Sequence, residues 1–146
     1  MKSTIPALLL IASLFAVNYT VNAQCKGFAK KICKQELTPY IHDGNYHAAI
    51  LTEGEEAELY KTFYVGQNYR IAVCGAEPLT KIEFQVIDAY KNTLYDNREH
   101  NYAMTWDFKL ESSQQLKIVI KVPVSNKQAE YPFSSCVAIM FGFKEK

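Results

Sequence analysis

Residues 116–122, Leu-Lys-Ile-Val-Ile-Lys-Val, decide how this chain folds. Apolar side chains alternate there with Lys117 and Lys121, which is the period of a strand with one buried and one solvated face. Pro123 ends the run, because proline cannot donate to a sheet ladder. Residues 137–143, Val-Ala-Ile-Met-Phe-Gly-Phe, are apolar throughout. They predict a strand that is central or buried on both faces.

The same alternation predicts further strands at residues 56–64, 69–74, 82–86, 93–95 and 105–110. Turn signals separate them at residues 66–68 and 88–92, and no long helical pattern intervenes. Residues 26–37 have the spacing of a short amphipathic helix that Pro39 ends. We therefore expect an all-β fold, an antiparallel β-sandwich of about eight strands with jelly-roll-like topology and a short N-terminal helix. The polar residues 125–135 are expected to form a mobile loop.

The first 23 residues have the layout of a secretory signal peptide. Lys2 precedes an apolar run over residues 5–17, and Val-Asn-Ala at 21–23 suits cleavage after Ala23. The run is too short for a membrane span, which needs about 20 apolar residues. We expect residues 1–23 to be removed, leaving a single domain over residues 24–146 that is secreted or periplasmic, with no transmembrane segment.

Four cysteines, Cys25, Cys33, Cys74 and Cys136, predict two disulfides in an exported chain. In one continuous helix Cys25 and Cys33 would lie about 12 Å apart, too far to bond. Each would then join the N-terminal segment to the sheet through Cys74 or Cys136, which is the pairing we favour. If Gly27 breaks the helix, Cys25–Cys33 and Cys74–Cys136 is the better pairing. A lipid anchor on Cys25 is a further alternative, although Gln24 fits poorly before a lipidated cysteine.

The charge of the expected mature chain argues against nucleic acid as a partner. Of the 16 basic residues only Lys2 lies in the leader, so 15 remain against 15 acidic residues. Binding to phosphates needs a basic excess or stripe, which this balance does not provide.

Two polar groups are candidate metal sites. His42, Asp43 and His47 lie around a turn, where surface turn residues are the alternative interpretation. Asp88, Asp96, Asn97 and Asp107 could supply the loop oxygens that calcium prefers. The chain lacks the spacing of a known calcium loop, and hydrogen bonds within turns are the alternative role for Asp96 and Asn97. We therefore expect no cofactor, with calcium as the possible exception.

Tyrosines are the candidate binding residues, because an exposed tyrosine can stack on a sugar ring or anchor a protein interface. Tyr60 and Tyr64 fall on the polar face of their predicted strand, and Tyr90, Tyr95 and Tyr102 flank the polar loop around Asp96. The alternative is that they cap the sandwich. Trp106 alternates with Phe108 and Leu110, which predicts a core position. The chain has no nucleophile elbow, HExxH or phosphate-loop motif, so we do not expect an enzyme.

Several short elements resemble those of small uncharacterised secreted proteins of Bacteroidetes-type bacteria. They are Gly66-Gln67 with Tyr69-Arg70, Asp96-Asn97, Trp106-Asp107-Phe108, Cys136-Val137-Ala138 and Gly142-Phe143. The order of strands also resembles, more loosely, pre-peptidase C-terminal and GOLD-like domains. The second resemblance implies an accessory or adhesion role.

The sequence therefore predicts a secreted, non-catalytic sandwich that binds a partner protein, an envelope component or a glycan. One alternative is a calcium-stabilised structural or accessory domain of the envelope. The other is a hydrolase of unrecognised type, which would show a cleft with perturbed acids or histidines near His42, His47 or His100.

Overall fold

The computed structural model describes residues 20–125 and 130–145. Within them lie one α-helix, two short 3₁₀ helices and nine strands. The helices are α1 (Thr20–Lys31), η1 (Cys33–Leu37) and η2 (Asn97–His100). The strands are β1 (Ile41–His42), β2 (His47–Thr52), β3 (Glu56–Phe63), β4 (Asn68–Gly75), β5 (Glu83–Ile87), β6 (Thr93–Asp96), β7 (Thr105–Lys109), β8 (Gln114–Lys121) and β9 (Ser134–Lys144).

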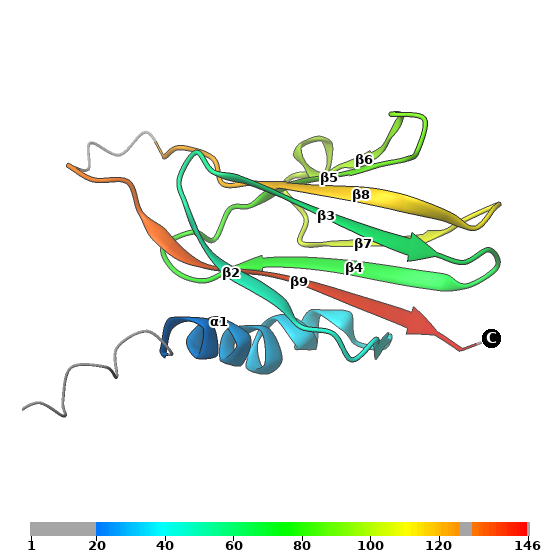
Figure 1. The fold of residues 1–146 in the computed structure, drawn as a ribbon, viewed down its shortest axis with the longest axis horizontal. Coiled ribbons are helices and arrows are strands. Elements are labelled where there is room, and N and C mark those ends of the chain that lie inside the picture. Colours follow the sequence, from blue (N-terminus) through cyan, green and yellow to red (C-terminus); the bar gives the residue numbers. More distant parts are fainter. Residues whose placement is uncertain (1–19, 126–129, 146) are drawn as a thin grey trace, which may run out of the picture.

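The strands form two antiparallel sheets that face each other (Figure 1). Sheet A has the order β1-β9-β4-β7, with β2 paired to the same edge of β9 as β1. Sheet B has the order β3-β8-β5-β6. Each sheet combines strands that are far apart in sequence, as a sandwich requires. The predicted fold class, an antiparallel β-sandwich with a short helix, is confirmed.

The main core lies between the sheets and comes from the alternating residues. Leu116, Ile118 and Ile120 point inward from β8, and Val137, Ile139 and Phe141 point inward from β9. The opposite residues of β9, Ala138 and Met140, are buried as well. Strand β9 is therefore covered on both faces and bonded on both edges, as its unbroken apolar sequence predicts.

A second, smaller core lies between the helical segment and the outer face of sheet A. Ala29, Cys33 and Leu37 pack there against Ala72, Ala138 and Met140. Figure 1 shows α1 on the side of β2 and β9, while sheet B lies on the opposite side of the sandwich. Two disulfides join this layer to the sheet, Cys25–Cys136 and Cys33–Cys74. The prediction that both N-terminal cysteines bond to the sheet is confirmed.

The helical segment differs from the continuous helix predicted over residues 26–37. Helix α1 ends at Lys31, and a separate 3₁₀ turn, η1, follows from Cys33 to Leu37. Ile32, at the break, is exposed, while Ala29, Cys33 and Leu37, which follow one another four residues apart, are buried against the sheet. The helical structure does end before Pro39, as predicted. Strands β1 and β2 are not among the strands that the alternation of residues predicts.

Two predictions reach beyond the described residues. The leader is not tested, because residues 1–19 lie outside them, and the expected cut after Ala23 falls within α1. Of the loop predicted at residues 125–135, residues 126–129 also lie outside, and residues 134 and 135 already belong to β9.

Candidate functional site

The outer face of sheet B is a candidate binding surface because no α-helix covers it in the described part of the chain, and only η2 borders it at the β6 edge (Figure 1). Its residues alternate with the core residues of β3, β8 and β5. The register aligns Glu56 and Glu83 on either side of Lys121, and Tyr60 and Ile87 on either side of Lys117. The face thus carries charges of both signs around a tyrosine.

Tyr60 and Tyr64 are the exposed aromatic residues of this face. Their exposed fractions are 57% and 63%, and they follow the outward alternation of β3. Next to Tyr60, Lys117 Nζ donates to Glu58 Oε1 at 3.2 Å. This hydrogen bond raises the pKa of Lys117. The predicted position on the polar face of the strand is confirmed for Tyr60, whereas Tyr64 is exposed just beyond the end of β3 at Phe63.

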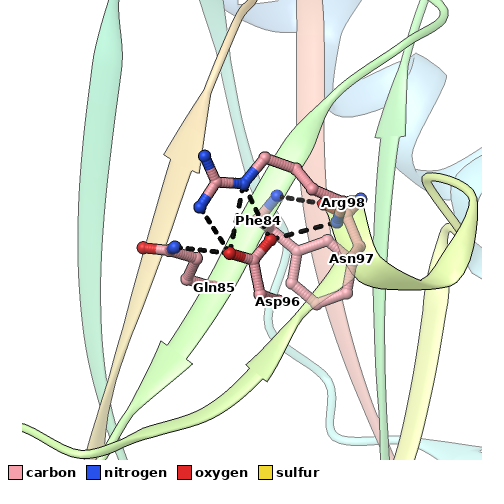
Figure 2. A network of polar contacts seen from close by, with 5 residues as sticks. All are labelled: Phe84, Gln85, Asp96, Asn97 and Arg98. Carbon is pink, nitrogen blue, oxygen red and sulfur yellow. Dashed lines mark hydrogen bonds and ion pairs between the residues drawn. The ribbon is translucent and has the colours of Figure 1, made fainter.

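Figure 2 shows a polar network at the far edge of the same sheet. Asp96 accepts from Gln85 Nε2 at 2.7 Å and from Arg98 Nη2 at 2.5 Å, and its Oδ1 also caps η2 through the Arg98 N–H at 3.0 Å. The hydrogen bonds from Arg98 hold the pKa of Asp96 well below its usual range. Asp96 therefore stays ionised and fixes the turn after β6.

Asn97, beside this network, is fully buried. Its Oδ1 accepts from the Phe84 N–H at 2.9 Å (Figure 2). Its Nδ2 donates to the Ile82 carbonyl at 2.8 Å. A second, longer bond reaches the Ala103 carbonyl at 3.3 Å. Asn97 thus satisfies backbone groups that would otherwise be buried without partners, which makes it a structural residue.

The four calcium candidates do not come together as one ligand set. Asp96 and Asn97 are engaged as described. Asp88 accepts from the N–H groups of Tyr90 and Asn92 within the β5–β6 turn, whereas Asp107, on the other sheet, forms an ion pair with Arg70. In the described residues no group of three or more His, Cys, Asp or Glu is arranged to hold a metal. Calcium binding stays a prediction without a located site.

The three tyrosines predicted around the polar loop have different environments. Tyr90 is 86% exposed at the tip of the β5–β6 turn, and Tyr102 is half-buried with Lys81 Nζ 3.8 Å from its ring centroid. Tyr95 is only 7% exposed, so its prediction as a surface contact is wrong. Its ring stacks between His100 and Trp106, at centroid distances of 4.9 Å on both sides.

Trp106 continues this stack toward the core. Its ring lies 4.5 Å from that of Phe108, and both pack at the margin of the main core. Trp106 therefore packs against the core, as predicted, but it is only partly buried at the core margin. Because each ring covers the face of the next, Tyr95 and Trp106 do not present free faces to a sugar.

Of the candidate metal group His42, Asp43 and His47, His42 and Asp43 are in contact, but the three are not arranged to hold a metal, and Lys61 pairs with the Asp43 carboxylate. Lys61 Nζ lies 2.8 Å from Asp43 Oδ2, and His42 Nε2 lies 3.6 Å from Asp43 Oδ1. Burial lowers the pKa of His47, and the positive charge of Lys61 acts in the same direction. The Lys61 ammonium already neutralises the carboxylate, so this group is not suited to a cation.

A groove separates the sheets where β2 and β3 lie opposite each other. Its volume is about 360 Å³, within the range of ligand pockets. Apart from Tyr46, His47 and Glu58 its lining is aliphatic: Ala48, Ala49, Leu51, Ala57, Leu59, Ile120, Val137 and Ile139. Sequence reasoning missed it, although the uncharged run His47–Thr52 is a detectable signal.

Arg70 is another residue that the sequence did not single out. Its guanidinium pairs with Asp107 at 2.6 and 2.8 Å, donates to the carbonyls of Glu36 and Thr38, and lies 4.6 Å from the Tyr40 ring centroid. The hydrogen bonds from Arg70 lower the pKa of Asp107. Arg70 thus fastens the end of η1 to sheet A.

Comparison with known proteins identifies no family, since no family model and no curated protein matches the chain. The crystal structure of Aeromonas hydrophila PliG, a periplasmic lysozyme inhibitor of g-type lysozyme, is similar in fold. The TM-score is 0.51 at 11% sequence identity, and the match covers 73% of this chain and 89% of PliG. At this identity the likeness concerns the fold alone.

A de novo designed double-stranded β-helix, solved by NMR, is a weaker match. Its TM-score is 0.31 at 13% identity, with 68% of this chain and 99% of the design covered. This likeness is too low to support an argument. The resemblance to secreted Bacteroidetes-type proteins is not addressed by either structure and stays a prediction.

Proposed function

We propose that this chain is an exported, non-catalytic protein that binds a partner protein through the outer face of sheet B. The observation that carries the proposal is the exposure of Tyr60 and Tyr64 on a sheet face without a cover. Tyrosine is enriched among the residues that dominate binding energy, and paired charges are typical of the surrounding rim. Glu58 and Lys117 supply such a pair beside Tyr60.

Two further observations support an exported binder. Both disulfides close between buried or nearly buried sulfurs, and disulfides persist mainly in oxidising compartments. PliG, which shares the fold, is a periplasmic inhibitor of an enzyme. Across residues 20–125 and 130–145, no helix is long and apolar enough to cross a membrane.

A protein partner is favoured over a glycan by the use of the aromatic rings. Sugar recognition relies on free ring faces, and the stack of His100, Tyr95, Trp106 and Phe108 consumes the faces of its inner rings. A hydrolase would need a nucleophile beside a base. His47 in the groove has a perturbed pKa, but Glu58, the carboxylate of the lining, is bonded to Lys117.

The proposal is tested by placing a photo-crosslinking amino acid at position 60 of the oxidised protein, with position 90 as the matched control. Both positions hold exposed tyrosines, but Tyr90 lies at a turn and not on the face of sheet B. We expect a discrete protein adduct from envelope extracts at position 60 only. Equal labelling at both positions, or none at position 60, would contradict the proposal.

A direct assay with purified g-type lysozyme accompanies this experiment, because the fold neighbour inhibits that enzyme. Inhibition of cell-wall lysis that the double substitution Tyr60→Ser with Tyr64→Ser removes would identify the partner. Unchanged lysis with a position-60 adduct would point to another protein. A chain that forms no adduct and inhibits nothing would exclude a binding role for this face.

A further inference from the structure

Strand β2 is the one edge strand of more than two residues in the described part of the chain that carries no Asp, Glu, Lys or Arg. The edges of the two sheets are formed there by β2, β7, β3 and β6, and by the two-residue strand β1 beside β2. Strand β7 contains Asp107 and Lys109, β3 contains Glu56, Glu58 and Lys61, and β6 ends in Asp96. Natural proteins place charges on edges to prevent pairing with other chains. Strand β2, with the sequence His-Ala-Ala-Ile-Leu-Thr, lacks this protection.

The register shows which backbone groups of β2 point away from the sheet. Glu53 N–H donates to the Phe133 carbonyl, one position beyond the paired residues Thr52 and Ser134. Hydrogen-bonded pairs alternate along an antiparallel ladder, so Ala49 and Leu51 bond to β9, whereas Ala48 and Ile50 direct their N–H and carbonyl groups outward. The N–H of Thr52 also points outward, and it is taken by Glu55 Oε2 at 2.8 Å.

The side chains of the same strand alternate between the two faces of sheet A. Ala49 and Leu51 lie opposite Val137 and Ser135 and line the groove toward β3. Ile50 lies opposite Cys136, on the side of α1, and is 45% exposed. An added strand would therefore direct every second side chain into the groove, over Ala57 and Leu59 of β3.

We propose that β2 accepts one extended segment of a partner protein, which adds a strand to sheet A and fills the groove with apolar side chains two residues apart. The outward N–H and carbonyl groups of Ala48 and Ile50 have the alternating arrangement that pairs with a peptide backbone. The lining requires an uncharged segment, because its one carboxylate, Glu58, is neutralised by Lys117. Strand addition of this kind obtains affinity from the main chain and specificity from alternate side chains.

A second copy of this chain satisfies these requirements less well. If two copies paired through their β2 strands, the second copy would place its own Ala49 and Leu51 on the groove side. In the first copy these same side chains already line the groove and leave it open. The inference goes beyond the proposed function, because β2 belongs to sheet A and not to the tyrosine-bearing face of sheet B. Either proposal can therefore fail alone.

The test uses the oxidised protein and a displayed library of random nonapeptides as the probe. Three variants separate the features of β2. Ala49→Lys places a charge in the groove. Ile50→Pro removes an outward N–H that β9 does not use, which an edge strand tolerates. Ile50→Lys is the matched control, with the same charge on the opposite face and the outward N–H retained. Circular dichroism and thermal melts establish that each variant is folded.

We expect selected peptides to alternate apolar residues and to slow amide exchange at Ala48 and Ile50. Their affinity should fall about tenfold or more with Ala49→Lys and with Ile50→Pro, and by less than about threefold with Ile50→Lys. Failure to select peptides, or peptides indifferent to Ala49→Lys, would overturn the proposal. So would a dimer in sedimentation experiments that Ala49→Lys dissociates, because the occupant would then be a second copy. Peptides that protect amides around Tyr60 instead would locate the binding to sheet B.

Discussion

Sheet A and sheet B pack against the same main core, but their outer faces have different surroundings. The outer face of sheet A is covered by α1 and η1, held by Cys25–Cys136 and Cys33–Cys74 and by Arg70. The outer face of sheet B is open and carries Tyr60 among paired charges. One sheet is thus built into the molecule on both sides, while the other leaves a face available to a partner.

The difference is already present in the local sequence of the strands. Strands β4 and β9 of sheet A are apolar on both faces over Ile71–Cys74 and residues 137–141. Strands β8 and β5 of sheet B alternate in burial, with Val119 and Ile87 as the apolar residues among their outward positions. A strand that is apolar on both faces needs a cover, and here the cover is only 18 residues long, from Thr20 to Leu37. A cover this short buries little surface, so we expect it to depend on the disulfides.

Removing the disulfides should have the largest effect on the stability of the covered side. We expect Cys25→Ala with Cys136→Ala, and separately Cys33→Ala with Cys74→Ala, to lower the free energy of unfolding by about 3–5 kcal/mol each. The loops span 111 and 41 residues, which alone predicts a larger loss for the first pair by about 1 kcal/mol. Urea unfolding measures both losses.

Amide exchange then tells where the loss acts. Protection at Ala138 and Met140, beneath the cover, should fall further than protection at Ile118 and Ile120 of sheet B. Equal loss at all four positions would mean that the two layers unfold as one unit, contrary to the comparison.

The polar network of Asp96 and Asn97 stabilises the β6 edge of sheet B. Asn97→Ala should cost about 2–4 kcal/mol in urea unfolding, because it leaves the Phe84 N–H and the Ile82 carbonyl buried without partners. Asn92→Ala is the control, since the Asn92 side chain lies at the exposed β5–β6 turn and donates to Asp88 Oδ2 at 2.9 Å. It should cost less than about 1 kcal/mol. If both variants lost a similar free energy of unfolding, the buried hydrogen bonds of Asn97 would stabilise the fold no more than an exposed turn contact.

The strands were predictable because each alternates over its own length. In residues 116–122 and 137–143 the order of polar and apolar residues itself predicts which side chains are buried, so β8 and β9 follow from local periodicity. The pairing of cysteines was partly predictable for the same reason, because helical spacing keeps Cys25 from Cys33. Even so, only the fold decides that Cys25 meets Cys136 and Cys33 meets Cys74.

The candidate site was less predictable because it depends on contacts between distant segments. Tyr60 and Tyr95 both sit in strands, yet one is exposed and the other is stacked between Trp106 and His100 from later elements. The groove beside β2 arises where two edges of different sheets meet. No local pattern encodes that meeting, and only the missing charge on β2 hints at it.

Two glycines on the covered side of sheet A have opposite surroundings, one crowded and one open. A Cβ on Gly142 of β9 would lie 2.8 Å from Tyr40 Cβ and 3.3 Å from Leu37 Cδ2, so the segment around η1 would have to move. Gly142→Ala should therefore cost about 1–3 kcal/mol. Gly27 of α1 has open space around it, and Gly27→Ala should stabilise by about 0.5–1 kcal/mol through helix propensity. Thermal melts of both variants check the pair, and a shift of the same sign would refute this account.

The smallest expected effect is the dependence of stability on pH, which comes from both sides of the sandwich. The pKa of Asp96 beside sheet B and that of Asp107 on sheet A are lowered by hydrogen bonds from Arg98 and Arg70. A lowered carboxylate pKa favours the folded state above the unfolded value of about 3.9, and this contribution is lost as the pH falls below it.

His47 adds a separate, weaker step at higher pH. Burial lowers its pKa below the ordinary histidine value of about 6.5, so the unfolded chain binds its proton first as the pH falls. Stability from neutral His47 is thus complete above about pH 6.5 and declines below it. Urea midpoints measured from pH 7.5 to 3 should show a shallow decline that His47→Gln removes and a steeper acid loss that Asp96→Asn reduces. Because His47 lines the groove beside β2, a strand bound there should deepen the burial of the ring and enlarge the shallow step. An unchanged step in the presence of a selected peptide would place that peptide elsewhere.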